Sequence, residues 1–132
     1  MAISVDDALG VHPHAMKLAH QRSQVIGANL ANADTPNYKA RDIDFEGAMR
    51  AELGRREGLT MTTTSEGHLA GPGGNPGELQ YRVPFQPSID GNTVDAAKEQ
   101  TRFSENSMRY MASLQFVEGT FSTLNKAAGG QG

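Results

Sequence analysis

The stretch "NLANADTPNYKARDIDFE" runs from Asn29 to Glu46, between a segment with helical periodicity and a charged, extended run. Thr35-Pro36-Asn37 has turn chemistry, because Pro fixes φ and Asn tolerates the left-handed region. Asn29 and Asn32 can cap free helix carbonyls or form hydrogen bonds to another helix. An ordinary helix end would explain the turn but not both asparagines. The stretch therefore predicts a defined joint between a helix and an extended arm.

The segment before the joint predicts a helix over about residues 5–33. Small and medium side chains recur there in alternating steps of four and three, which is an a/d heptad pattern. Because Pro is tolerated in a first helical turn, the sequence allows the regular helix to start near Pro13, after a looser arm. The members of this stripe expected to meet a partner helix are Met16, Ala19, Ile26 and Leu30.

A second heptad stripe predicts a helix from about residue 92 to Ala128. Asn92 is the expected N-cap, and "GGQG" at 129–132 cannot continue a helix. Large residues facing small ones suit interdigitating helices, so we expect the two terminal helices to pack as a coiled-coil-like pair. The large members of the second stripe are Phe103, Tyr110, Leu114, Val117, Phe121 and Leu124.

The middle of the chain, residues 34–91, has a different character. "FEGAMRAELGRREG" predicts a short helix around Phe45–Leu53, and "LTMTTTS" predicts a short strand. "LQYRVPF" predicts an edge strand because it contains Pro84, and "GPGGNPG" at Gly71–Gly77 predicts a loop. We therefore predict a mainly α fold: paired terminal helices from 1–33 and 92–128, an irregular middle with short β-strands, and a 129–132 tail.

Composition limits what the chain can do alone. Only 37% of its 132 residues are hydrophobic and 6% are aromatic, so we expect partner subunits to supply part of the burial. A net charge of -3 without a basic run argues against nucleic acid as a partner. The lack of Cys excludes disulfides and thiolate metal sites. No stretch reaches the roughly 18–20 apolar residues of a membrane span, and "MAISVDDALG" is not followed by the apolar core of a cleaved signal.

Candidate chemistry is sparse. Three histidines lie near the N-terminus: His12, His14 and His20. No Cys or carboxylate pair completes a metal site around them. Asp42, Asp44 and Glu46 would share one face of an extended strand, but little apolar surface nearby can perturb their pKa values. A solvated face or an inter-subunit contact is therefore favoured over catalysis, and we expect no metal, no cofactor and no enzymatic activity.

The joint resembles the signature of flagellar axial proteins, in which an N-terminal helix ends in Asn-Leu/Ile-Ala-Asn before Thr-x-x-Tyr-Lys. The matching residues are Asn29, Leu30, Ala31, Asn32, Thr35, Pro36, Tyr38 and Lys39. "ARDIDFE" and "DGNTVDAAKEQTRFSENSMRYMASLQF", from Asp90 to Phe116, are most similar to the proximal rod proteins of the bacterial basal body. Asn37 stands where that family usually has Gly, and Asn is a good substitute at positive φ.

The resemblance implies a structural subunit that is exported unfolded through the flagellar type III apparatus without a cleaved signal. Such subunits stack helically into the rod, which crosses the periplasm, transmits torque and encloses the export channel. The implied partners are copies of the chain, other rod proteins, the hook-basal-body adaptor at the rod base, the MS-ring and the export gate. Neither nucleic acid nor membrane insertion is implied.

The residues suggest how such a subunit works. We expect the two stripes to pack together, the joint to set the angle of the arm, and Arg41, Asp42 and Asp44 to make polar contacts between subunits. Three alternatives stay open. These are a stand-alone coiled-coil adaptor, another type of proximal rod subunit, and a small enzyme that uses the carboxylates at 42–46.

Overall fold

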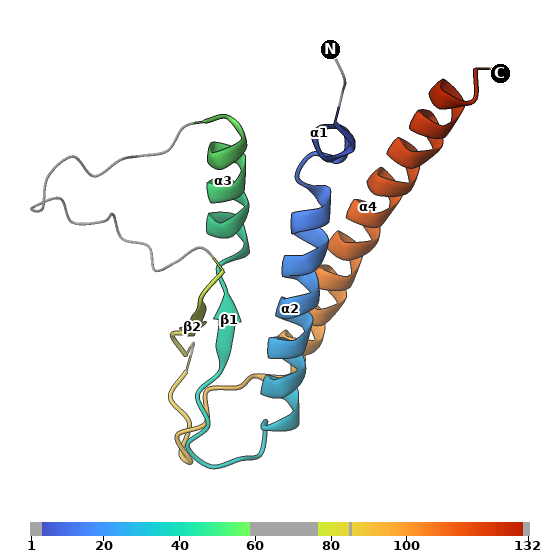
Figure 1. Ribbon diagram of the computed structural model, residues 1–132. Coiled ribbons are helices and arrows are strands. Elements are labelled where there is room, and N and C mark those ends of the chain that lie inside the picture. Colours follow the sequence, from blue (N-terminus) through green and yellow to red (C-terminus); the bar gives the residue numbers. More distant parts are fainter. Residues whose placement is uncertain (1–3, 59–76, 85, 131–132) are drawn as a thin grey trace, which may run out of the picture.

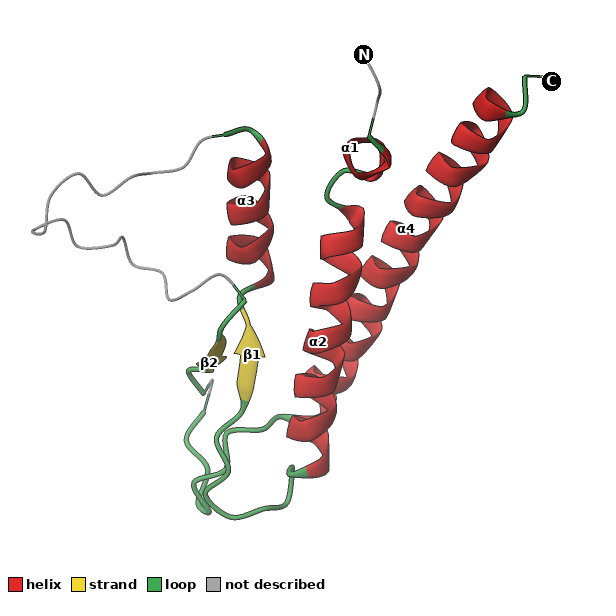
Figure 2. Ribbon diagram, viewed as in Figure 1, coloured by secondary structure: helices red, strands yellow, loops and turns green. Residues whose placement is uncertain are grey.

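The computed structural model describes residues 4–58, 77–84 and 86–130 and shows the predicted mainly α fold (Figures 1 and 2). Two long helices lie near the ends of the chain, and a short antiparallel pair of strands lies in the middle. In chain order the elements are α1 Val5–Leu9, α2 His12–Ala31, β1 Arg41–Ile43, α3 Phe45–Arg56, β2 Leu79–Tyr81 and α4 Ala96–Ala128.

Helices α2 and α4 lie side by side and antiparallel, and α4 projects beyond the start of α2 (Figure 1). The N-terminal helix is not continuous from residue 5 to 33 as predicted. Gly10, with φ of +60°, ends α1, and α2 begins at His12 with Pro13 in its first turn. A positive φ is cheap for glycine and breaks the helical path. His12 belongs to α2, and its ring stacks on Phe116 of α4 with centroids 4.6 Å apart.

The predicted N-cap of α4 is wrong. Asp95 caps the helix, because its Oδ1 accepts a hydrogen bond from the Lys98 N–H at 3.2 Å. Asn92 lies three residues earlier, where its amide is occupied by the end of α2. The predicted end of α4 at Ala128 is confirmed.

The middle of the chain forms an arm beside α2. Asp44 caps α3 by accepting a hydrogen bond from the Gly47 N–H at 2.9 Å, and the helix extends to Arg56, beyond the predicted Leu53. The expected strand in "LQYRVPF" is present as β2, which pairs with β1 in the register Arg41↔Tyr81 and Ile43↔Leu79. The strand predicted for "LTMTTTS" lies outside the described residues.

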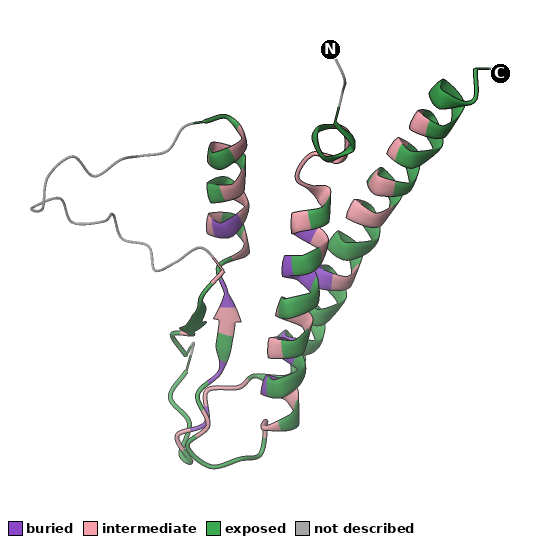
Figure 3. Ribbon diagram, in the orientation of Figure 1, coloured by how far each residue is buried: buried purple, intermediate pink, exposed green. Residues whose placement is uncertain are grey.

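The core of the chain is small and lies between α2, β1 and α3 (Figure 3). Leu18, Ile43 and Ala48 form its buried centre, with Val25 and Phe45 packed against it. Four of the seven buried hydrophobic residues in the described part of the chain are alanines. Little apolar surface is therefore removed from water, and burial contributes correspondingly little stability.

Candidate functional site

Asn29 is the central residue of the joint and is fully buried. Its Nδ2 donates hydrogen bonds to the Arg41 carbonyl at 2.7 Å and to Glu99 Oε2 at 3.1 Å. Its Oδ1 accepts a hydrogen bond from the Arg41 N–H at 3.1 Å. The Asn29 amide thus pairs with both main-chain groups of Arg41, as a neighbouring strand would. It therefore supplies hydrogen-bond partners to the main chain on the edge of β1 that faces α2. Buried main-chain N–H and C=O groups without partners would cost stability.

The end of α2 is held by side chains from both halves of the chain. Asn32 Nδ2 donates to the Ala28 carbonyl at 2.8 Å, and Asn32 Oδ1 accepts from the Thr35 hydroxyl at 3.1 Å. Asn92 is buried, and its Nδ2 lies 2.8–2.9 Å from the carbonyl oxygens of Asn32, Ala33 and Thr35. Free carbonyls at a helix C-terminus need such donors. Asn92 therefore fastens the exit of α2 to the chain that leads into α4.

The turn after α2 is matched to a second turn before α4. Asn37 has φ of +62°, and its N–H donates to the Asp90 carbonyl at 2.9 Å. Gly91, with φ of +74°, lies so close that an added Cβ would be 2.6 Å from Asn37 Oδ1. The Tyr38 carbonyl accepts from the Thr93 N–H at 3.0 Å. These contacts align the two connections between the helices and the arm.

Buried charges connect the arm to both long helices. Asp42 on β1 pairs with Arg22 of α2 at 2.8 Å and with Arg82 at 2.7 Å. Glu99 on α4 is fully buried and pairs with Arg82 and, at 2.9 Å, with Arg102. Burial alone would raise the pKa of Asp42, but hydrogen bonds from Arg22 and Arg82 outweigh it and lower the pKa below its ordinary value.

Asp42 and Asp44 both make contacts within the chain, since Asp42 pairs with two arginines and Asp44 caps α3. Arg41 and Asp44 are exposed and Asp42 is half-buried, and the contacts between subunits expected of these three residues stay a prediction. Glu46 lies in the first turn of α3 and does not converge with Asp42 on a pocket. Within the described residues no group of three or more His, Cys, Asp or Glu side chains suits a metal ion.

The two predicted stripes are placed differently. On α2, Ala19 and Ile26 are buried, while Met16 and Leu30 are half-buried. On α4 the residues most buried against α2 are Glu99 and Asn106, and Asn106 Nδ2 donates to the Ala19 carbonyl at 2.7 Å. Leu114, Val117 and Leu124 of the predicted stripe are half-buried. Its three aromatic members are exposed by 44, 37 and 50%: Phe103, Tyr110 and Phe121.

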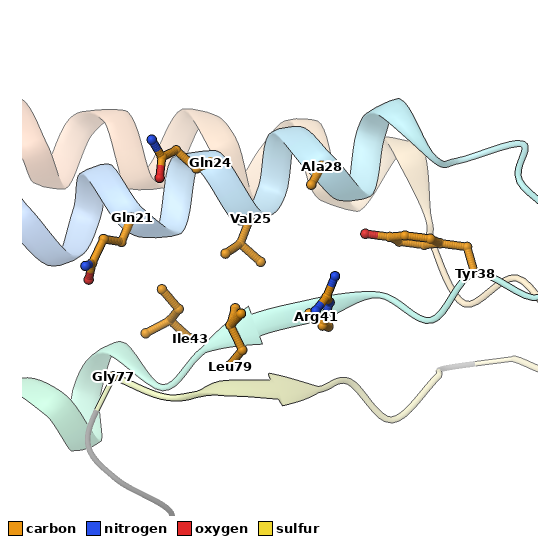
Figure 4. Close-up of a pocket in the computed structure, with 9 residues that line it drawn as sticks. All are labelled: Gln21, Gln24, Val25, Ala28, Tyr38, Arg41, Ile43, Gly77 and Leu79. Atoms are coloured by element: carbon orange, nitrogen blue, oxygen red, sulfur yellow. The ribbon is translucent and has the colours of Figure 1, made fainter.

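An open groove separates α2 from the arm (Figure 4). It encloses about 390 Å³, and the side chains of Val25, Ile43 and Leu79 point toward one another across it. Gln24 and Arg41 add polar groups to its lining. No helix in residues 4–58, 77–84 and 86–130 combines the length and apolar composition that a membrane span requires.

The joint coincides with a known family signature. A family model described as "Flagella basal body rod protein" matches residues 9–39, which span α2 and the turn that follows it. The chain is 46% identical over 132 residues to the flagellar basal body rod protein FlgB of Aeromonas hydrophila, covering 99% of each chain. FlgB of Escherichia coli (strain K12) is 44% identical over 125 residues, 90% of this chain and 91% of the relative. FlgB of Cereibacter sphaeroides (strain ATCC 17029 / ATH 2.4.9) is 47% identical over 128 residues, 95% of this chain and 96% of the relative.

The chain belongs to the FlgB family of flagellar basal body rod proteins. FlgB proteins are structural, so this chain is a structural subunit of the flagellar basal body rod and not an enzyme. The side chain of the signature residue Asn29 forms hydrogen bonds with the main chain of β1. The signature residues Asn32 and Thr35 form hydrogen bonds at the C-terminal end of α2.

Sequence reasoning missed five residues that complete the FlgB joint. Asn92 was assigned to the wrong helix end, and the others were not singled out: Arg22, Arg82, Glu99 and Asn106. One signal was available for Glu99 and Asn106. They are seven residues apart, and they directly precede Gln100 and Ser107, which continue the four-and-three steps of the second stripe. Glu99 and Asn106 therefore form the adjacent heptad frame.

Proposed function

We propose that this FlgB-family chain assembles helically with copies of itself and with other rod proteins into the torque-transmitting shaft around the export channel. The terminal helices, 1–33 and 92–128, form the inner tube, and the joint, arm and middle region at 34–91 contact neighbours. Residues 129–132 form a tail. The two seams provide apolar contacts between subunits, and Arg41, Asp42 and Asp44 provide polar ones.

One observation carries this proposal: among residues 4–58, 77–84 and 86–130, more large apolar side chains are exposed than buried. On α4 alone, six of them are at least 37% exposed: Phe103, Met108, Tyr110, Met111, Phe116 and Phe121. Phe103, Tyr110 and Phe121 fall on one face of α4 by their heptad spacing. Large exposed apolar patches mark surfaces that another protein covers. A subunit that completes its burial on assembly also gains stability from its partners by mass action.

The wider setting follows from membership of the family. We propose that the chain is exported without a cleaved signal and takes its place in the part of the rod that crosses the periplasm. There it meets the hook-basal-body adaptor, the MS-ring and the type III export gate. A chain with a small core suits export in an unfolded state, because little stability has to be overcome before transport.

A substitution on the exposed face of α4 tests the proposal. We expect Phe121→Asp to prevent incorporation into basal bodies in a flagellated bacterium that lacks its own copy, because the carboxylate would be buried at a subunit contact. Ile89→Asp is the matched control, since Ile89 is also an exposed large apolar residue but lies in the loop before α4 and not on the helix. Incorporation is measured by immunoblot of purified basal bodies, after far-UV circular dichroism has shown that both variants keep their helices.

The alternative of a stand-alone adaptor makes a different prediction. Such a module would show full helicity and a cooperative melt in dilute solution, without dependence on concentration. A rod subunit should gain helicity and thermal stability as the chain is concentrated and sediments as larger species. Normal incorporation of Phe121→Asp, together with a concentration-independent melt, would refute the proposed assembly.

A further inference from the structure

Two unlike surfaces of the chain are left open at different places along the helix pair. The first is the groove between α2 and the arm, which we call the α2–β1 groove. Its volume of about 390 Å³ lies within the range of about 300–1,000 Å³ for sites that enclose a ligand. Leu79 in its lining is 48% exposed, so apolar surface faces solvent there.

The second surface lies near the C-terminal end of α4. Leu114, Glu118 and Phe121 share one face of the helix, because residues three and four apart are neighbours. Helix α1 approaches a different face, where Ala8 lies near Phe116, Thr120 and Thr123. Phe121 is 50% exposed. We call the face formed by Leu114, Glu118, Phe121 and Asn125 the α4 end face.

The charges of the two surfaces are complementary. Arg41 in the lining of the groove forms no side-chain ion pair within the described part of the chain, and neither does Glu118 on the α4 end face. Each therefore offers an uncompensated charge beside apolar side chains. The groove supplies a cation next to Val25 and Ile43, and the helix supplies an anion one turn from Phe121. Such complementarity steers association and fixes register.

We propose that the α2–β1 groove receives the α4 end face of a second copy of this chain. Phe121 of that copy packs between Val25, Ile43 and Leu79, and its Glu118 pairs with Arg41. The inference rests on the proposed self-assembly and names the surfaces involved. Because the groove and the end face are different surfaces, the contact is heterologous, and repetition of it builds an open filament instead of a closed dimer.

The shape of the molecule fits a staggered arrangement. The groove lies beside the half of α2 that leads into the joint, whereas the end of α4 projects past the start of α2 at the opposite end (Figure 1). A second copy must therefore shift along the helix axis before its α4 end reaches the groove. Neither surface can meet its complement within the same chain.

Disulfide trapping tests the contact directly, because the chain contains no Cys. Gln21 lines the groove, and its side chain points from α2 toward the arm (Figure 4), so Gln21→Cys places a thiol in the groove. Asn125→Cys places one on the α4 end face. One of the two single-Cys variants carries an added tag, and both are mixed at a concentration that gives sedimenting species. Mild oxidation is expected to produce the mixed 21–125 disulfide as the main product on a non-reducing gel. Ser104→Cys, on an exposed part of α4 outside the end face, is the matched control and should give little mixed product with Gln21→Cys.

Charge reversal supplies an independent test. Arg41→Glu and Glu118→Arg should each weaken association by about tenfold, and the double variant should recover most of the loss. Arg50→Glu changes an exposed arginine on α3 outside the groove and should leave association unchanged. Sedimentation velocity over a concentration series measures the effect.

The outcomes separate this inference from the proposed function. The mixed disulfide together with rescue by the double reversal supports the groove contact. Association without the mixed disulfide, or without rescue, overturns the groove contact and leaves self-assembly standing. A chain that remains monomeric at every concentration overturns self-assembly and the groove contact with it.

Discussion

Replacing Asn29 by leucine should destabilise the chain more than any other change of comparable size in the joint. The Asn29 amide is completely buried and connects α2 to both β1 and α4. Leucine keeps the branched arrangement of the side-chain heavy atoms but has larger methyl groups, and the control variant described below carries the same increase in volume. The comparison of the two variants therefore tests the hydrogen bonds and not the space that the side chain fills.

The expected loss follows from the partners that Asn29 leaves behind. Each neutral hydrogen bond to the Arg41 main chain contributes about 1 kcal/mol, and the bond to the Glu99 carboxylate about 1.5–3 kcal/mol. Burial of the leucine side chain returns about 1.5–3 kcal/mol. The free energy of unfolding should then fall by about 0.5–3.5 kcal/mol, a substantial part of the roughly 5–15 kcal/mol of an ordinary domain.

Asn106→Leu is the matched control. Asn106 is 1% exposed between the same two helices, but it donates only one hydrogen bond, to the Ala19 carbonyl, and its buried Oδ1 has no partner. Burial of the leucine side chain contributes the same free energy as at position 29, while the lost hydrogen bond costs only about 1 kcal/mol. The free energy of unfolding should therefore be unchanged or slightly increased. Equilibrium urea unfolding followed by far-UV circular dichroism measures both variants at one chain concentration. Equal losses for the two variants, or no loss for Asn29→Leu, would refute the assigned role of Asn29.

Three further predictions concern the same region. Asp42→Asn should cost about 2–4 kcal/mol at neutral pH because two arginines lose their half-buried charged partner. The native pKa of Asp42 is below its ordinary 3.8, so the difference in unfolding free energy between the parent chain and the variant should be full above pH 3.8 and shrink as the pH falls below it. Urea unfolding midpoints measured over a series of acidic pH values check this. Gly91→Ala should lower the melting temperature, because a left-handed backbone costs a non-glycine residue about 1–2 kcal/mol and the new Cβ would meet Asn37. Asn37→Gly should keep the melting temperature or raise it slightly, since glycine adopts a φ of +62° without strain.

The sequence was sufficient to predict the positions of those elements that depend on interactions between neighbouring residues. The heptad patterns located α2 and α4, and the lack of helix-forming residues after Ala128 located the end of α4. Turn chemistry located the exit from α2, where Asn37 does adopt a positive φ. Each of these features depends on residues within one or two helical turns of each other, which is the range that periodicity and turn preferences describe.

The joint depends on contacts between residues far apart in the chain. Asn92 has good N-cap chemistry, but it lies against the end of α2, about 60 residues away in sequence, and Asp95 takes the cap instead. Local preference could not decide between two candidates three residues apart. Arg22, Asp42 and Arg82 likewise become partners only when β1 and β2 pair beside α2. The sequence around a charged residue does not indicate which distant residue it will pair with.

The placement of α4 shows why an apolar pattern alone can mislead about the interior of such a chain. Arg102 and Asn106 lie one residue before Phe103 and Ser107, and a step of one residue turns the helix by about 100°. The polar frame, with Glu99 and Asn106, faces α2 and fixes one register through specific hydrogen bonds. The aromatic members of the apolar frame, Phe103, Tyr110 and Phe121, remain exposed. In an isolated globular domain the apolar frame would have to face inward to offset the conformational entropy lost on folding. A subunit that folds into an assembly is free to divide the two tasks, with polar contacts specifying its own shape and apolar contacts reserved for its neighbours. On this view the aromatic members of the α4 heptad pattern predict the contact between subunits and not the contact within the chain.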